Sequence, residues 1–201
     1  SEEMQLALRD GFGFKRGIPI RLNDKKIAVA YEITDVDSGD KWFGSAGLTI
    51  GITTGDGSQA RVQGFGSVSV FSAYVSDLSA ASFNDGDHVA LAYRKRDSLG
   101  SLDVGMVTLM DTSTVVPQVK ISIEFSSVPA TFIDIVMIST KTVAVAYREP
   151  TRGYIGKGLV INLVQGDTQL QATTSVPVAD ASSIDPSYLL KVSKISTSKF
   201  V

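Results

Sequence analysis

Three aspartates lie within one short stretch of the sequence, at Asp35, Asp37 and Asp40. They place oxygen ligands at alternate positions around Gly39, an arrangement that is typical of calcium-binding loops. A complete calcium loop needs more ligands than this stretch holds, and the equivalent stretches later in the chain lack the pattern. The residues therefore favour an ordinary solvated turn over a bound calcium ion. No other cofactor is predicted.

Aromatic and arginine side chains occur beside these aspartates and in two later stretches of the same kind. Together they form a predicted rim of Trp42, Arg94, Arg96, Arg148, Arg152 and Tyr154. Aromatic residues and arginines are enriched at protein-binding surfaces, and an aromatic ring can also stack on a sugar. The alternative is that Trp42 packs over the edge of a sheet, because large aromatic side chains usually bury. We therefore expect the rim to contact a protein partner, or a glycan in the alternative hypothesis.

Catalytic signatures are scarce. His88 is the single histidine, and no Gly-x-Ser-x-Gly motif is present to position a serine beside it, so we expect a structural or solvated role. The paired carboxylates of a glycoside hydrolase need proximity in space and not in sequence, and the available candidates are Glu32, Glu124, Asp134 and Glu149. No acidic position recurs in the repeats described below. The sequence therefore predicts a protein that is not an enzyme.

Composition excludes several classes of protein. The 201 residues contain no cysteine, which rules out disulfides and thiolate metal sites. A net charge of −2, from 19 basic and 21 acidic residues, gives no electrostatic reason to bind nucleic acid or an anionic membrane. The apolar runs are far shorter than the roughly 20 residues of a membrane-spanning helix, and the acidic N-terminus does not resemble a signal peptide.

One pentapeptide, written three times, indicates which elements position these residues. It reads Ile-Ala-Val-Ala-Tyr at 27–31, Val-Ala-Leu-Ala-Tyr at 89–93 and Val-Ala-Val-Ala-Tyr at 143–147. Large residues alternate with alanine at a period of two, which predicts a β-strand with one bulky face and one face of methyl groups. We expect the alanine face to let a neighbouring sheet approach closely. The tyrosines are 62 and then 54 residues apart, and such a period indicates a propeller, a solenoid or another array.

Each repeat contains four strand-like segments, of which the pentapeptide is the second. The first segments are 18–22, 78–83, 133–138 and 189–195, and a short polar turn follows each. The third segments begin at Gly47, Gly105 and Gly158, and a glycine there predicts a bulge or a close backbone approach. The fourth segments are 60–62 or 68–71, then 119–125, then 170–176, and residues 119–125 alternate as a half-exposed edge strand does.

Four antiparallel strands in 54 to 62 residues match the size of a propeller blade. The predicted fold is therefore an all-β, β-propeller-like array, with a β-sandwich as the runner-up. The predicted organisation is the end of a preceding repeat at 1–16, repeats at 17–73, 74–128 and 129–185, and the start of a fourth at 186–201. Gly-Phe-Gly sequences at 11–13 and 64–66 are expected to mark bends between repeats. Three and a half blades cannot close a ring, so we expect a fragment of a longer protein or closure by a second copy.

The motifs of the second repeat resemble a known type of tandem repeat. Phe-Ser-Ala-Tyr at 71–74, Leu-Ser-Ala-Ala-Ser-Phe at 78–83 and His-Val-Ala-Leu-Ala-Tyr-Arg at 88–94 are similar to units of large repeat proteins of algae and other protists. Tyr-Arg-Glu at 147–149 and the closing Lys-Phe-Val fit the same pattern. The chain departs from it where the third strand should read Gly-x-Ala. The resemblance implies propeller-like repeats in extracellular or surface assemblies.

The sequence thus predicts a non-catalytic structural and interaction module of an extracellular or cell-surface assembly. Its expected partners are proteins, either further copies of itself or other members of the assembly, and no nucleic acid or membrane span is expected. A lectin-like carbohydrate-binding propeller that uses the rim around Trp42 is the alternative. A glycoside hydrolase ranks third.

Overall fold

The computed structural model describes residues 12–35, 44–54, 61–69, 74–83, 85–96, 103–114, 116–139, 142–150, 155–162, 172–179, 194–196 and 199–200. Every element in these residues is a β-strand, which confirms the all-β prediction. Nowhere in these ranges is there a helix long and apolar enough to cross a membrane. Of residues 1–16, interpreted above as the end of a preceding repeat, residues 1–11 lie outside the described residues.

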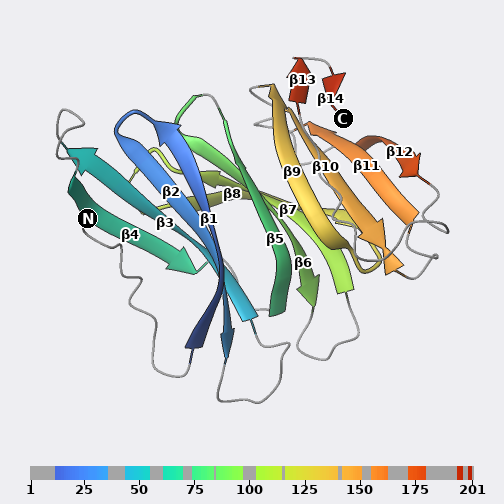
Figure 1. Cartoon of the computed structure of the whole chain (residues 1–201), viewed down its shortest axis with the longest axis horizontal. Helices are drawn as coiled ribbons and strands as arrows, with labels where there is room; N and C mark the ends of the chain where they lie inside the picture. The colour runs from blue at the N-terminus through green and yellow to red at the C-terminus, as the bar shows by residue number, and fades with distance from the viewer. Residues whose placement is uncertain are drawn as a thin grey trace.

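Twelve of the strands form three antiparallel four-stranded sheets, each a simple up-and-down succession (Figure 1). The first sheet contains β1 (Phe12–Asn23), β2 (Lys26–Asp35), β3 (Gly44–Thr54) and β4 (Arg61–Ser69). The second contains β5 (Tyr74–Ser82), β6 (His88–Arg96), β7 (Asp103–Asp111) and β8 (Gln118–Ser126). The third contains β9 (Thr131–Ser139), β10 (Thr142–Glu149), β11 (Ile155–Asn162) and β12 (Ala172–Ala179).

Each sheet corresponds to one repeat, and the alanine pentapeptide is the second strand of all three, as predicted. The four-strand interpretation of the repeat is therefore confirmed, although β1 begins at Phe12, inside the stretch that we assigned to a preceding copy. A short fourth hairpin follows, in which β13 (Lys194–Ser196) pairs with β14 (Lys199–Phe200). These are the positions expected for the first two strands of another copy.

The two unlike faces of the pentapeptide explain how the first sheet packs on the second. Ala28 and Ala30 of β2 lie in one hydrophobic cluster with Val89, Leu91 and Tyr93 of β6. The methyl groups of one sheet thus receive the bulky face of the next. These five side chains are at most 1% exposed, and burial of a side chain the size of Leu or Val stabilises the fold by about 1.5–3 kcal/mol.

The same arrangement recurs between the second and third sheets. Here Ala90 and Ala92 of β6 lie in a cluster with Val143, Val145 and Tyr147 of β10. The second sheet is therefore covered on both faces, by the first sheet on its bulky side and by the third on its alanine side. The expectation that the alanine face admits a neighbouring sheet is confirmed twice.

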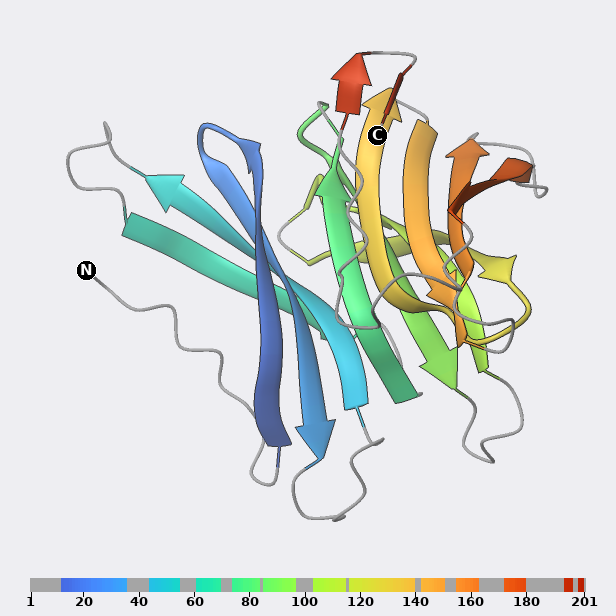
Figure 2. The same cartoon turned by 45° about the vertical axis from the view of Figure 1, so that its right-hand side comes forward.

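The first strand of each later sheet contacts the sheet that comes before it in the chain. β5 contacts β1, β2 and β3, and β9 contacts β5 and β6, while β13 contacts β9. Figure 2 shows β5 and β9 (green and gold) side by side, with β4 and β12 at the far sides of their sheets. The second and third sheets therefore meet chiefly at their first strands.

The third-strand glycines do not occupy equivalent positions, which corrects the sequence alignment. Gly47 pairs with Tyr31, Gly105 with Arg94 and Gly158 with Ala146. The counterpart of Gly105 is Gly156, which pairs with Arg148, and both glycines immediately precede a register shift against the fourth strand. At Gly105 the predicted close approach is present, because a Cβ there would lie 2.5 Å from the Phe125 ring.

Two smaller expectations have opposite outcomes. β8 is the edge strand that its alternation predicted, with side chains exposed or half-exposed from Gln118 to Phe125. The Gly-Phe-Gly sequences, by contrast, do not mark bends between repeats. Residues 12–13 lie in β1, and residues 64–66 lie in β4. Pairing across a sheet outweighs the turn preference of glycine at these places.

Candidate functional surface at the arginine end of the sheets

The strands β2, β6 and β10 all end at the same side of the molecule (Figure 1). We call this side the arginine end, because Arg94 and Arg96 lie near the end of β6 and Arg148 lies near the end of β10. Arg94 and Arg148 occupy matching positions, since each pairs across its sheet with the glycine that precedes the bulge. Arg94, Arg96 and Arg148 of the predicted rim therefore lie at this end.

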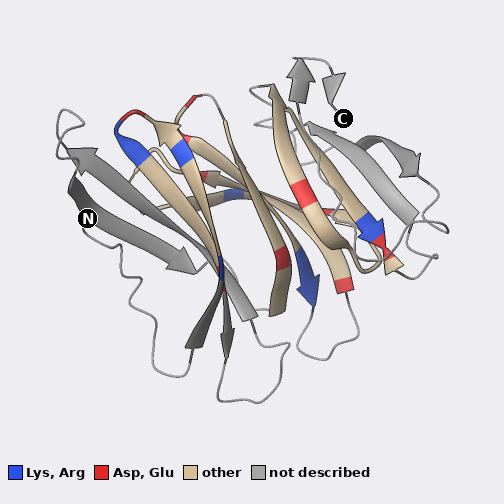
Figure 3. Cartoon of the chain, in the orientation of Figure 1, with Lys and Arg blue, Asp and Glu red and all other residues tan. Residues whose placement is uncertain are grey.

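Asp103, the first residue of β7, binds both arginines of β6. The Arg94 Nε atom lies 2.6 Å from Asp103 Oδ1, its Nη2 donates to Oδ2, and Arg96 Nη2 lies 2.9 Å from Oδ2. Burial alone would raise the pKa of the Asp103 carboxyl, but hydrogen bonds from the two guanidinium groups outweigh it and lower the pKa. The same hydrogen bonding raises the pKa of Arg94. This group is therefore an internally paired ion cluster (Figure 3).

A second set of contacts joins the arginine end of the second sheet to that of the third. Asp77 of β5 has a φ of 57°, and its counterpart Phe132 of β9 has a φ of 51°. Both lie where the first strand bulges against its neighbour. The Asp77 carboxylate lies close enough to Arg94 to raise the arginine pKa, and its Oδ1 accepts a hydrogen bond of 3.0 Å from the Phe132 backbone N–H.

The ring of Phe132 then supports Arg148, whose Cζ atom lies 4.9 Å from the ring centroid. Arg148 is only 4% exposed. One line of contacts thus runs from Arg94 through Asp77 and Phe132 to Arg148. Beside it, Ser79 Oγ donates to Asp134 Oδ1 at 3.1 Å, again between β5 and β9. The Asp77–Phe132 and Ser79–Asp134 hydrogen bonds cross from the second sheet to the third, and the two arginines lie at either end of this line within their own sheets.

The third sheet adds a buried aromatic contact beside this line. The Tyr147 ring meets the Phe125 ring edge-on, with 5.0 Å between centroids. Burial raises the pKa of Tyr147, and the nearby Glu149 carboxylate raises it further. Glu149 itself is 2% exposed. The Phe125 and Tyr147 rings thus fill the space between β8 and β10.

The remaining residues of the predicted rim and calcium loop are Trp42, Arg152, Tyr154, Asp37 and Asp40, which lie outside the described residues. Asp35 is the last residue of β2. Sequence reasoning missed Asp77 and Asp103. The hairpin register, in which Arg96 pairs with Asp103, could have identified the second of these, because the two lie an equal distance from the loop that joins β6 to β7.

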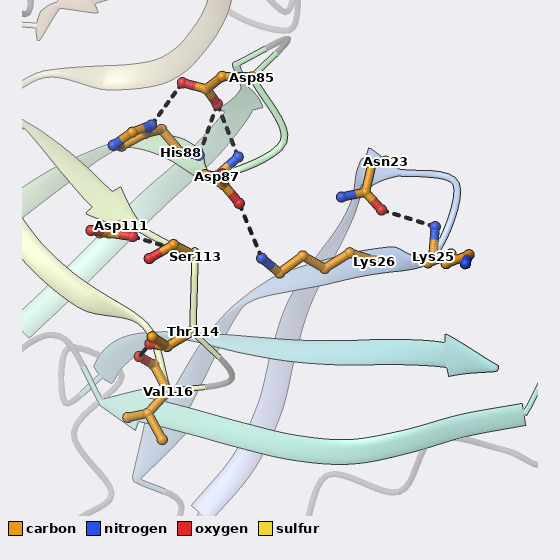
Figure 4. Close-up of polar contacts among 10 residues, drawn as sticks. All are labelled: Asn23, Lys25, Lys26, Asp85, Asp87, His88, Asp111, Ser113, Thr114 and Val116. Atoms are coloured by element: carbon orange, nitrogen blue, oxygen red, sulfur yellow. Dashed lines mark hydrogen bonds and ion pairs between the residues drawn. The ribbon is translucent and has the colours of Figure 1, made fainter.

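The opposite end of the sheets carries the tight turns (Figure 4). Asp85 accepts hydrogen bonds from the backbone N–H groups of Asp87 and His88, and its Oδ2 lies 2.7 Å from His88 Nδ1. Lys26 of the first sheet pairs with Asp87 at 3.3 Å. Hydrogen bonds from Lys120 and Ser113 hold the pKa of Asp111 well below its usual range. Asp85 thus fixes the backbone and the ring of His88 at the turn between β5 and β6.

The carboxylates of the described residues are distributed over several strands. No three His, Cys, Asp or Glu side chains of the described ranges gather as metal ligands would. The candidate carboxylates for glycoside hydrolysis come from different strands, with Glu32 on β2, Glu124 on β8, Asp134 on β9 and Glu149 on β10. Glu32 and Glu149 are at most 2% exposed, and Asp134 accepts from Ser79. The Asp134 carboxylate thus takes part in a contact between the second and third sheets.

No protein-family model matches this chain, and no curated protein matches it. A functional conclusion therefore rests on the contacts and surfaces described above.

Proposed function

We propose that the chain is a non-catalytic structural and interaction module, built as a propeller-like array of sheets, that joins proteins in an extracellular or surface-exposed assembly. The observation that carries this proposal is the use of one interface twice, bulky face on alanine face. The recurring residues of the repeat, which are its large side chains and alanines, are consumed by this packing. Such a module supplies a rigid body that presents surfaces and edges.

The packing of the middle sheet supports an array over a two-sheet sandwich. In a sandwich each sheet buries one face and exposes the other. Here Val89 and Leu91 of β6 pack toward the first sheet, while Ala90 and Ala92 of the same strand pack toward the third. The contact of β9 with β5, each the first strand of its sheet, also fits blades that spread from an axis.

The state of the polar groups supports a role without catalysis. Arg94 and Arg96 share Asp103, and Arg148 is buried over Phe132. A catalytic centre needs groups that are held ready for substrate, whereas these arginines are satisfied within the fold. The carbohydrate-binding alternative depends on Trp42, outside the described residues.

Sedimentation of the purified 21.4 kDa chain over a wide range of concentrations tests the proposal. We expect species well above monomer mass that dissociate on dilution or in denaturant. A folded monomer at every concentration would overturn the self-assembly part of the proposal. Glycan-array binding that is lost in Trp42→Ala would replace it with the lectin function, and the Lys25→Ala variant, altered in an exposed turn residue, is the matched control.

A further inference from the structure

The outer strand β8 differs from the rest of the described surface. It lies at the edge of the second sheet and pairs with β7 along one side. The two exposed large hydrophobic side chains of the described residues are Val116 and Val119, at 53% and 47% exposure, and they flank the start of this strand. An edge strand with exposed apolar side chains is a template for pairing with another strand.

The fourth strands of the other two sheets carry residues that oppose such pairing. β12 contains Pro177, which has no backbone N–H to donate, and β4 contains Gly64 and Gly66, which weaken a strand. β8 reads Gln-Val-Lys-Ile-Ser-Ile-Glu-Phe-Ser from 118 to 126, with neither glycine nor proline. Its β-branched residues are those that pair most readily in sheets.

The sequence of β8 is complementary to itself when two copies run antiparallel about Ser122. Ser122 then faces Ser122 of the second copy, and Ile121 faces Ile123. Lys120 faces Glu124, and the two-fold symmetry creates that attractive pair twice. A register shifted by two residues in either direction loses these two pairs, so charge specifies the alignment.

The local geometry of β8 is compatible with this register. Residues 121–124 pair regularly with β7, and the register shifts fall on either side of them, at Lys120 and Phe125. The regular stretch therefore contains the centre of the proposed ladder. Lys120 pairs with Asp111 of its own sheet at 2.8 Å and is 40% exposed in its side chain, which leaves its ammonium group accessible to a second carboxylate.

We propose that two copies of this chain associate through antiparallel pairing of β8 with β8, with Ser122 on the two-fold axis. The inference rests on the proposed function, because it assigns the surface by which the module meets a second copy. The second sheets of the two copies join into one continuous sheet. Val116 and Val119 lose their exposure, and two Lys120–Glu124 pairs flank the axis.

Charge reversal tests the register directly. When both copies carry Lys120→Glu alone, the introduced carboxylate faces Glu124 on each side of the axis. When both carry Glu124→Lys alone, the introduced ammonium group faces Lys120 on each side. We expect each single variant to raise the dissociation constant by at least about tenfold, because directly opposed like charges destabilise a strand pair. The double variant restores opposite charges and should associate as the natural chain does.

Mixing the two single variants is the sharpest arm of the experiment. In a mixed dimer of Lys120→Glu with Glu124→Lys, both facing pairs hold opposite charges. One facing pair then joins the two introduced side chains, which attract, and the other joins the two natural ones, Lys120 and Glu124, which also attract. Native mass spectrometry of differently labelled chains should therefore detect mixed dimers in preference to either homodimer.

Asp111→Asn is the control, since it removes the charged partner that Lys120 has in its own sheet without changing a charge on β8. Its association should be unchanged.

The outcomes separate this inference from the function on which it rests. If the natural chain assembles and all four variants assemble equally well, another surface joins the copies, and the β8 proposal is overturned while the assembly function stands. A natural chain that is monomeric at every concentration removes both. Loss in the single variants with recovery in the double variant and in the mixture supports the β8 pairing.

Discussion

The two interfaces between sheets follow one packing rule but differ in their polar contacts. Between the first and second sheets, alanines meet bulky side chains, and the turns are linked by the Lys26–Asp87 ion pair. Between the second and third sheets the same packing is accompanied by hydrogen bonds within the interface, from Phe132 to Asp77 and from Ser79 to Asp134. Among the described residues, the first interface has this polar contact at its solvent edge, and the second has two partly buried hydrogen bonds.

This difference teaches that apolar complementarity defines the stack and that polar contacts adjust its strength. An ion pair with Asp87 52% exposed contributes about 0–1 kcal/mol. A hydrogen bond to a partly buried backbone N–H costs about 1–3 kcal/mol to break, because the donor is left without water. The second and third sheets should therefore separate less readily than the first and second. The following experiments test that ranking.

The largest effects are expected from emptying the centre of each interface. Leu91→Ala loosens the first interface and should lower the free energy of unfolding by about 2–5 kcal/mol, because Leu91 is fully buried. Val145→Ala does the same at the second interface with fewer atoms removed. Hydrogen exchange should show lost protection chiefly in the first sheet for Leu91→Ala and in the third sheet for Val145→Ala. Equal loss in all three sheets would contradict two separable interfaces.

Filling the alanine faces is expected to cost somewhat less. Ala28→Leu and Ala90→Leu each insert a bulky side chain where the facing sheet already packs, and each should destabilise the chain by about 1–3 kcal/mol. Denaturant titration measures the change. Lys25→Leu is the control, since it adds similar bulk at an exposed turn. If Ala28→Leu left the free energy of unfolding unchanged, the first interface would be loosely packed, and the difference between the two interfaces would be larger than proposed.

Asp77 tests the polar difference itself. Asp77→Ala removes the acceptor for the Phe132 N–H and leaves a Cβ residue at positive φ, so we expect a loss of about 1–3 kcal/mol. Asp77→Asn keeps an acceptor and tolerates this backbone conformation, and it should retain most of the stability. Asp77→Gly relieves the backbone but not the hydrogen bond. If the Asp77→Gly variant is as stable as the natural chain, the hydrogen bond contributes little to stability.

The ion pair at the turns should matter least at neutral pH. Lys26→Ala removes the contact with Asp87, and the expected change in the free energy of unfolding is below about 1 kcal/mol. Salt should reduce the difference between the variant and the natural chain, because this contact is partly exposed. A loss of several kcal/mol that salt does not alter would contradict the ranking, because polar contacts would then stabilise the first interface as strongly as the second.

Alkaline pH should affect the interfaces without any mutation. Burial raises the pKa of Tyr93 from 10.0 to about 12, against hydrogen bonds with Thr108 and Ser122 that lower it. The folded state favours the neutral phenol, so its contribution to stability is complete below pH 10.0 and is lost as the pH rises toward about 12. Phenolate absorbance should show a late step that Tyr93→Phe removes. Early ionisation of every tyrosine with the fold intact would contradict this.

The sequence allowed the strands and their faces to be predicted because period-two alternation is a local signal. The edge position of β8 followed in the same way. The alignment of Gly158 with Gly105 was wrong by two residues, since loops of unequal length separate the strands and both Gly156 and Gly158 fit the pattern. The contacts of Asp77 were not predictable, because they depend on the backbone of another sheet 55 residues away.

Within the predicted rim, residue type indicated the location but not the role. Arginine beside the repeated tyrosine suggested a surface for partners, yet the structure places Arg148 over Phe132 and binds Arg94 to Asp103. Phe132 lies on β9 and Asp103 on β7, and the register of these strands with β10 and β6 brings the two residues to the arginines. Only the cross-strand pairing of Arg96 with Asp103 could have been derived beforehand, from the hairpin that contains them.

Unlike faces give the chain a direction of growth. A flat slab with two identical sides can be turned over and still fit its neighbour, but a sheet with a thick side and a thin side cannot. If a whole repeat were duplicated and inserted between residues 73 and 74, its bulky face and its alanine face would each meet a complementary face of a neighbouring sheet. The chain can therefore be lengthened by complete repeats without a new kind of interface. The insertion of a single residue within a second strand would instead exchange the two faces of that strand and disrupt both interfaces.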